Sequence, residues 1–167
     1  TMPAKEQIMP LLSRVDETAK KIGAVNTVVR EGNQWVGYNT DCSGAIKALE
    51  TCTSLQGKNV LILGCGGTAK AIGYGVKEKG GRLTITYHGD KERGESLAKE
   101  LACELVHARE AGTRPIDILI NCSPVGMSPN VDETPFLARD LKQGMVVFDS
   151  VYNPMETKLL REAKTAG

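Results

Sequence analysis

The sequence predicts an α/β protein, a doubly wound parallel sheet preceded by part of a smaller α/β unit. Three observations lead to this prediction. From residue 59 onward, short apolar runs of strand length alternate with runs of helical length, which is typical of a parallel sheet covered by helices on both faces. A glycine-rich loop directly follows the first apolar run. Residues 1–54 lack this rhythm, so we assign them to a separate unit and residues 55–167 to the α/β unit.

The first unit is expected to contain a hairpin between two helices. Apolar residues recur at roughly helical spacing before residue 23, with Pro10 as a break or kink. Thr40 or Asp41 is placed to cap the second helix. The expected elements are a helix over 5–22, strands over 25–30 and 34–38 joined by a turn at 31–33, and a helix over 40–52.

The second unit is expected to alternate strands with helices. Its apolar runs are short enough for strands, and several have the composition of strands buried on both faces. Right-handed crossovers between such strands give a Rossmann-like core. We expect strands over 59–63, 82–87, 105–107, 116–120 and 145–148, and helices over 68–79, 90–102, 136–141 and 156–166.

A glycine loop runs from Gly64 to Ala71, between the first strand and the first helix of this unit. Gly64 permits a tight turn, and Gly66 lets backbone N–H groups approach a pyrophosphate. The helix that begins near Gly67 adds partial positive charge at its N-terminus. The loop therefore predicts a dinucleotide site, with a plain glycine turn as the alternative.

The end of the second strand normally selects between NAD and NADP, through an acid for the ribose hydroxyl or an arginine for the 2′-phosphate. Here the strand ends in Tyr87, His88 and Gly89, which provide neither. His88, Lys91 and Arg93 could together form a phosphate site, although the last two also suit a solvated first helical turn. The missing acid favours NADP over NAD without excluding NAD.

Lys5 and Asp41 are the residues of the first unit best suited to proton transfer. If they share a cleft, the ammonium can give or take a proton at a substrate hydroxyl, while the carboxylate keeps it charged and oriented. The alternatives are a solvated surface lysine and an aspartate that caps a helix.

Composition excludes several classes of protein. The net charge of +1 provides no basic field for nucleic acid. No apolar run approaches the roughly 18 residues that span a membrane. Five cysteines without a C-x-x-C pair, together with two histidines, predict free thiols and no metal site. The expected compartment is the cytoplasm, or the plastid if the source is a plant, and the expected partner is a small molecule.

Several segments together resemble the ordered motifs of the shikimate dehydrogenase family. The resemblance extends over essentially the whole chain. The segments are residues 1–6, 23–27, 38–41, 64–71, 121–127 and 151–154.

The resemblance implies a role for each matching residue. Lys5 would be the general acid/base and Asp41 would orient it, whereas Thr1, Asn26 and Tyr152 would contact substrate. The implied reaction is reversible hydride transfer between NADP(H) and shikimate, giving 3-dehydroshikimate. Together with Thr68 and His88, the candidate cofactor contacts are Gly64, Gly66, Gly67, Ala69, Asn121, Ser123 and Met127.

The sequence also departs from the family pattern. Tyr87-His88-Gly89 replaces the usual Asn-Arg-Thr run, which leaves an NAD-dependent quinate or quinate/shikimate dehydrogenase as the enzyme alternative. A non-catalytic nucleotide-binding module of the same fold is the alternative from another class. Family segments that precede Thr1 and follow Gly167 lie outside the sequence, so we expect a piece of a longer enzyme, which could be fused to dehydroquinate dehydratase.

Overall fold

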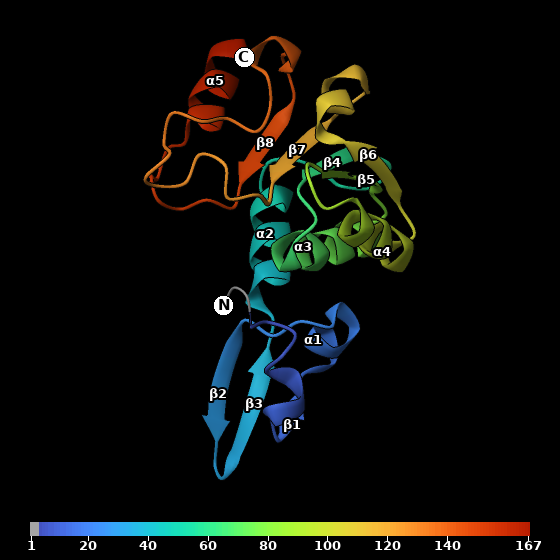
Figure 1. Ribbon diagram of the computed structural model, residues 1–167, viewed down its shortest axis with the longest axis vertical. Helices are drawn as coiled ribbons and strands as arrows, with labels where there is room; N and C mark the ends of the chain where they lie inside the picture. The colour runs from blue at the N-terminus through green and yellow to red at the C-terminus, as the bar shows by residue number, and fades with distance from the viewer. Residues whose placement is uncertain (1–3) are drawn as a thin grey trace.

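The computed structural model describes residues 4–167, which form two sheets joined by a helix (Figure 1). The smaller sheet has three strands in the order β1-β3-β2, and the larger has five in the order β6-β5-β4-β7-β8. The alternation of strands and helices that the sequence predicts begins at Asn59, the first residue of the larger sheet along the chain. The α/β fold with a doubly wound parallel sheet is confirmed.

The segment before residue 23 contains much less helix than expected. It forms a 3-10 turn at Met9–Leu11, strand β1 (Arg14–Val15) and helix α1 (Glu17–Ile22). Pro10 suits the start of the turn, because a proline has no N–H to donate. Asp16 then starts a new helix, since its side chain accepts from Thr18 N at 2.9 Å. The prediction of one helix over 5–22 is therefore wrong outside α1.

The predicted hairpin is confirmed. Strands β2 (Thr27–Glu31) and β3 (Gln34–Tyr38) pair antiparallel, with Glu31 opposite Gln34. Gly32 lies in the turn at φ +60°, a conformation that a residue with a side chain rarely adopts. Strand β1 adds to the other edge of β3 in parallel.

Helix α2 (Thr40–Glu50) follows the hairpin and is capped by a residue that the sequence analysis overlooked. The side chain of Asn39 accepts from the backbone N–H groups of Asp41 and Cys42. Asn39 is buried and also donates to Ala24 O at 3.0 Å. The prediction that Thr40 or Asp41 caps this helix is wrong, and the carboxylate of Asp41 is left available for another contact.

The larger sheet is parallel throughout. Its pairs are β4–β5, β4–β7, β5–β6 and β7–β8. The chain moves outward from β4 to β6 and then returns to β7 on the other side of β4, so the strand order reverses beside β4. Ligands of such sheets bind at the carboxyl ends of the strands at this reversal. The strands are β4 (Asn59–Leu63), β5 (Arg82–Tyr87), β6 (Glu104–His107), β7 (Ile118–Asn121) and β8 (Val146–Asp149).

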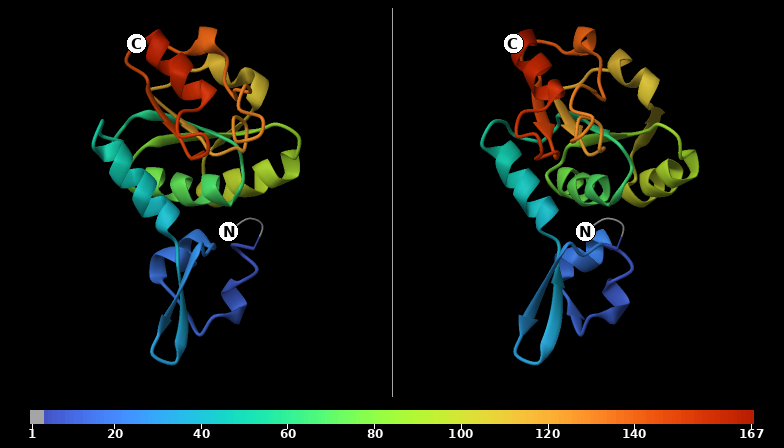
Figure 2. Two further views of the ribbon diagram at one scale, coloured as in Figure 1. Left: turned by 90° about the vertical axis from the view of Figure 1, so that its left-hand side faces the viewer. Right: turned by 60° about the vertical axis from the view of Figure 1, so that its left-hand side comes forward.

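Helices cover both faces of this sheet (Figure 2). Side chains of successive β4 residues point to opposite faces, so Val60 and Ile62 pack in one core while Leu61 and Leu63 pack in the other. The first core includes α2, α3 (Gly67–Glu78) and α4 (Lys91–Leu101), and the second includes α5 (Lys158–Ala166). The remaining 3-10 turns are Ala108–Thr113, which was not expected, and Ala138–Asp140, inside the expected helix 136–141.

Helix α2 connects the two sheets and packs against α3 (Figure 1). Ile46 and Leu49 of α2 belong to the same core as Ile72 and Val76 of α3. The helix assigned to the first unit therefore contributes to the core of the second. The division into residues 1–54 and 55–167 stays a prediction.

Candidate functional site

A cavity of about 620 Å³ opens between the first turns of α2 and α3 and the loops that follow β7 and β8. One wall comes from residues of the first unit, including Lys5 and Asp41. The rest of the lining comes from Thr68 at the start of α3, from the end of β8 and from the loops that follow β7 and β8. The cavity thus lies at the carboxyl ends of parallel strands, where the topology predicts a ligand site. The lining residues from the end of β8 are Phe148 and Asp149, and those from the loops are Cys122, Ser123, Pro124, Met127, Ser150, Val151 and Tyr152.

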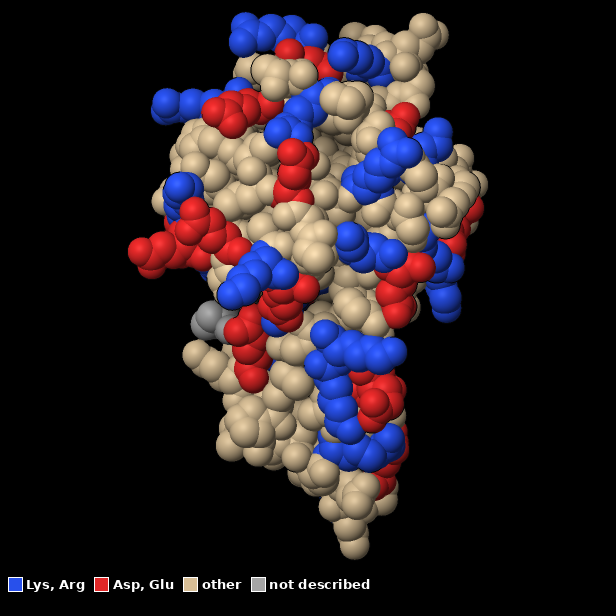
Figure 3. All heavy atoms as spheres, turned by 90° about the vertical axis from the view of Figure 1, so that its right-hand side faces the viewer, with Lys and Arg blue, Asp and Glu red and all other residues tan. Residues whose placement is uncertain are grey.

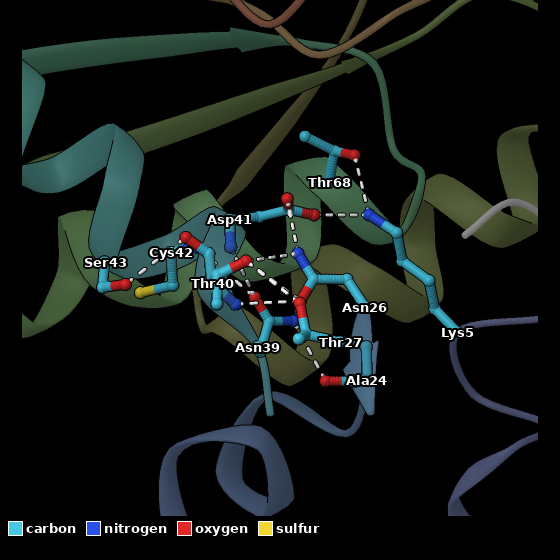
Figure 4. A network of polar contacts seen from close by, with 10 residues as sticks. All are labelled: Lys5, Ala24, Asn26, Thr27, Asn39, Thr40, Asp41, Cys42, Ser43 and Thr68. Atoms are coloured by element: carbon cyan, nitrogen blue, oxygen red, sulfur yellow. Dashed lines mark hydrogen bonds and ion pairs between the residues drawn. The ribbon is translucent and has the colours of Figure 1, made fainter. Parts of the chain in front are cut away.

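Lys5 and Asp41 are paired in this cavity (Figure 4). The ammonium of Lys5 donates to Asp41 Oδ2 and, at 3.3 Å, to Thr68 Oγ1. The side chain of Lys5 is 10% exposed and that of Asp41 29%, so the pair is largely shielded from water. Water and salt weaken an ion pair of this kind less than they weaken one on the surface, so its geometry is better maintained. The structure therefore brings together the two residues chosen for proton transfer.

Asn26 orients the carboxylate of Asp41. Its Nδ2 donates to Asp41 Oδ1 at 2.7 Å, and its Oδ1 accepts from Thr40 N and Thr27 Oγ1, both at 2.9 Å. Both ends of the amide are used, which fixes its orientation. Each oxygen of Asp41 consequently has its own donor, one from Lys5 and one from Asn26.

The glycine loop has the geometry of a phosphate cradle. Gly64 has a φ of +109°, and a Cβ there would lie 3.4 Å from the backbone of Cys122. Gly66 caps α3 without any side-chain hydrogen bond, so the first N–H groups of this 12-residue helix face the loop uncapped. Ala69 is fully buried, which lets α3 lie close to the sheet. These features fit the pyrophosphate of a dinucleotide.

A second cavity of about 620 Å³ lies on the other side of Gly64, at the ends of β4 and β5. His88 and Arg109 contribute polar groups, and Phe136 contributes apolar surface. Ser123 lines both this cavity and the one that contains Lys5. An extended ligand could therefore reach from one cavity to the other past the glycine loop.

The three basic residues after β5 do not share one hollow. His88 lines the second cavity, and its ring centroid lies 6.3 Å from that of His107. Lys91 pairs with Glu95 at 3.2 Å. Arg93 instead lines a third hollow of about 330 Å³, beside Gly66. A site formed by all three side chains would require them to move.

A buried network around Asp149 supports the loops of the first cavity. Asn121 Nδ2 donates to Asp149 Oδ1 at 2.9 Å, and Thr157 Oγ1 donates to Asp149 Oδ2 at 2.7 Å. Asn121 Oδ1 accepts from Ser123 N at 2.9 Å. Asn121 is fully buried, so its side chain orders the loop from within. Asp149 was not among the predicted site residues, and its position at the end of an apolar strand was the available signal.

The remaining candidates lie at the edges of the cavity. Tyr152 is 82% exposed and Met127 39%, and both line its rim. Thr1 lies outside the described residues. Within residues 4–167, no group of three His, Cys, Asp or Glu side chains could hold a metal ion. No helix in this part of the chain is long and apolar enough to cross a membrane.

Comparisons with known proteins show which family the chain resembles. A family model described as the shikimate dehydrogenase substrate binding domain matches residues 1–28. All of the chain aligns with the shikimate dehydrogenase (NADP(+)) of Syntrophobacter fumaroxidans, at 40% identity and over 59% of that protein. All of it also aligns with a chloroplastic bifunctional 3-dehydroquinate dehydratase/shikimate dehydrogenase of Arabidopsis thaliana, at 38% identity and over 31% of that protein. The chain spans less than two thirds of both relatives.

Solved structures show the same likeness. A shikimate dehydrogenase in complex with NADP+ matches with a TM-score of 0.91 and 38% identity, over 99% of this chain and 61% of that one. A quinate dehydrogenase from Corynebacterium glutamicum in complex with NAD matches with a TM-score of 0.88 and 32% identity, over all of this chain and 63% of that one. The predicted resemblance to the family is confirmed over the whole chain.

Proposed function

The chain is homologous to the shikimate dehydrogenases over its whole length, and from this premise we propose that the protein reversibly reduces 3-dehydroshikimate to shikimate with NADPH. The observation that carries the proposal is the shielded Lys5–Asp41 pair, which faces the cavity beside the start of α3. A proton-transfer pair beside a dinucleotide loop is the arrangement that a carbonyl reduction requires.

Lys5 handles the proton in this proposal. In the reductive direction its ammonium protonates the oxygen of the carbonyl being reduced, and in the oxidative direction the neutral amine accepts the proton. Asp41 holds the ammonium in place, and Asn26 holds Asp41. When bound, NADPH would supply the hydride in the reductive direction and NADP⁺ would accept it in the oxidative direction.

The cofactor would be held by the glycine loop and the second cavity. Backbone N–H groups at the start of α3 suit the pyrophosphate. Gly64, His88 and Ser123 line the cavity that suits the adenosine half. Met127 lies at the rim of the cavity that contains Lys5, where the nicotinamide would have to reach.

The substrate would be a small polyhydroxylated carboxylic acid. The polar groups that line the first cavity include Lys5, Asp41 and Ser150, which suit hydroxyl groups. Tyr152 would approach the substrate from the rim. Asn26 would contribute chiefly through Asp41, because both ends of its amide are already bonded.

An NAD-dependent quinate or quinate/shikimate dehydrogenase is the second candidate. The strand ends in His88 and Gly89, and neither is the arginine that would bind the 2′-phosphate of NADP. This missing arginine favours NAD. The similar Corynebacterium glutamicum protein is named a quinate dehydrogenase and is in complex with NAD. A binding module without catalysis has less support, because it would not need the Lys5–Asp41 pair.

The compartment and the partners of the whole protein are also proposals. We place it in the cytoplasm, or in a plastid if the source is a plant. Its partners are then shikimate and 3-dehydroshikimate, and a fusion to a dehydroquinate dehydratase is supported by the bifunctional plant relative.

Steady-state kinetics with the protein expressed from its complete gene tests the function. Each of NADP and NAD is combined with shikimate and with quinate, and we expect the highest kcat/KM for NADP with shikimate. A preference for NAD with quinate would establish the second candidate instead.

The Lys5→Ala variant tests the assigned chemistry. We expect kcat to fall at least 100-fold, because general acid/base catalysis contributes about 10² to 10⁴. Calorimetry should show NADP affinity within about threefold of the parent, since Lys5 is not part of the cofactor loop. Turnover at the parent rate would rule out the assigned role of Lys5.

A further inference from the structure

The geometry points to Thr68 as a positioning residue for Lys5: the hydroxyl at the start of the cofactor-loop helix holds the proton-transferring ammonium in place. The inference rests on the proposed function and adds a role that the motif alone does not assign. In the sequence analysis Thr68 was a candidate cofactor contact. In the structure its hydroxyl lies 3.3 Å from the ammonium of Lys5 (Figure 4).

Lys5 is anchored at one end and held at the other. Its backbone oxygen accepts from Val25 N at 2.8 Å, which fixes the main chain beside the small sheet. Its side chain then crosses to the helix that starts the nucleotide-binding half. A Cβ placed on Gly67 would lie 3.5 Å from Lys5 Cδ, so the lysine stem passes against the glycine loop. Residues 63 positions apart in sequence thereby meet at one ammonium group.

Two acceptors determine where the ammonium points. A lysine side chain has several rotatable bonds and three N–H donors, so one partner alone leaves it free to rotate. In the described part of the chain, Asp41 and Thr68 accept two of these donors. The third donor is left for a substrate oxygen in the cavity that all three residues line. Thr68 therefore limits the ammonium to directions that include the substrate.

The contact between Lys5 and Thr68 joins the proton-transfer pair to the helix that would bind the cofactor. Lys5 and Asp41 come from the segments around the small sheet, whereas Thr68 belongs to the first turn of α3. A movement of the glycine loop would change the distance from Thr68 to Lys5. The proton-transferring group is thus positioned partly by the element that would hold the cofactor's phosphates.

Substitution of Thr68 separates positioning from cofactor binding. Thr68→Val keeps the β-branched shape and removes the hydroxyl, whereas Thr68→Ser keeps the hydroxyl. We expect kcat to fall about five- to tenfold in Thr68→Val, because a hydrogen bond to a charged group is lost. In Thr68→Ser, which keeps this hydrogen bond, kcat should lie within about twofold of the parent. NADP affinity by calorimetry should change less than twofold in both. Thr165→Val, which removes an exposed hydroxyl bonded to its own helix, is the matched control.

Two outcomes would overturn the role of Thr68. One is an unchanged kcat in Thr68→Val, and the other is a loss of NADP affinity that accounts for the loss of rate. The double variant Lys5→Ala with Thr68→Val should be no slower than Lys5→Ala alone, if Thr68 acts through Lys5.

A stability measurement keeps this test separate from the proposed function. The same two substitutions form a double-mutant cycle in urea unfolding, which needs no turnover. We expect the unfolding equilibrium constants to show a coupling of at least twofold. Absence of coupling would refute the contact, whereas an inactive parent protein with intact coupling would refute only the proposed function.

Discussion

Asp41 illustrates how one side chain acquires its function from its neighbours. At the start of a helix, an aspartate commonly caps the exposed N–H groups. Here Asn39 provides the cap, so both oxygens of Asp41 are free to accept from Lys5 and Asn26. The cap and the ion pair are therefore related. Because Asn39 accepts from the first N–H groups of the helix, the carboxylate of Asp41 can face the cavity.

Arg93 is the residue through which we expect a preference for NADP to be expressed. One of its guanidinium nitrogens lies 3.8 Å from the position that a Cβ on Gly66 would occupy, so the charge faces the glycine loop. We expect Arg93→Gln to weaken NADP binding about tenfold and NAD binding less than twofold, because only NADP carries the 2′-phosphate. Calorimetric titration with each cofactor measures both affinities.

Arg109→Gln is the comparison for this prediction. Arg109 lines the second cavity together with His88, on the other side of the loop from Arg93. A larger loss of NADP affinity in Arg109→Gln than in Arg93→Gln would place the 2′-phosphate in that cavity and contradict the prediction.

At the scale of elements, the packing of α2 on α3 depends on a missing side chain. A Cβ on Gly75 of α3 would lie 2.5 Å from Ile46 Cγ1 and 2.8 Å from Cys42 Sγ. Both of these residues belong to α2 and are buried. Gly75 therefore lets the two helices approach closely, which joins α2 to the core of the larger sheet.

Two glycine-to-alanine variants test this packing. Alanine gains about 1 kcal/mol of helix propensity over glycine, but overpacking costs about 1 to 3 kcal/mol. We expect Gly75→Ala to lower the free energy of unfolding by about 1 kcal/mol. Gly44→Ala, in the interior of α2 with open space around it, should raise it by about 0.5 to 1 kcal/mol. Urea denaturation measures both, and equal stability of the two variants would contradict the packing argument.

At the scale of the whole molecule, residues from both halves of the chain line one cavity. Lys5 and Asp41 approach from the side of the small sheet, while Thr68 and Asp149 belong to the larger unit. Figure 3 shows basic and acidic side chains interspersed over one face.

The burial of cysteines across the molecule predicts their reactivity. Burial raises the pKa of Cys103 to about 11, whereas Cys52 is exposed. Burial also raises the pKa of Cys122. Because only the thiolate reacts, about one Cys103 side chain in a thousand is reactive at pH 8.

Alkylation with iodoacetamide, followed by mass spectrometry, tests this pattern. We expect Cys52 to be labelled first at pH 8, with Cys103 at least tenfold slower. Labelling of Cys103 should accelerate about tenfold per pH unit between pH 8 and 9.5, because the pH approaches its raised pKa from below. Equal labelling of Cys52 and Cys103 at pH 8 would show that Cys103 is not protected.

The sequence predicted most of the larger sheet because its local signals agree. Apolar runs, glycines at helix ends and the glycine loop each depend on neighbouring residues, and every predicted strand of that sheet is present within two residues of its expected bounds. The prediction for the segment before Asp16 was wrong because the spacing of its apolar residues is compatible with a helix. A proline at the start of a short turn and pairing with β3 override that spacing.

The sequence by itself determined the α/β class, the glycine loop and the hairpin, since residue types and short spacings carry those signals. It identified Lys5 and Asp41 as a pair through the resemblance to the shikimate dehydrogenase family. Only the tertiary structure decided that Lys5, Asp41, Asn26 and Thr68 meet in one cavity, and that Arg93 lies apart from His88. The physical reason is that such contacts join residues tens of positions apart. Their distances depend on how whole elements pack, and no local pattern in the sequence records that packing.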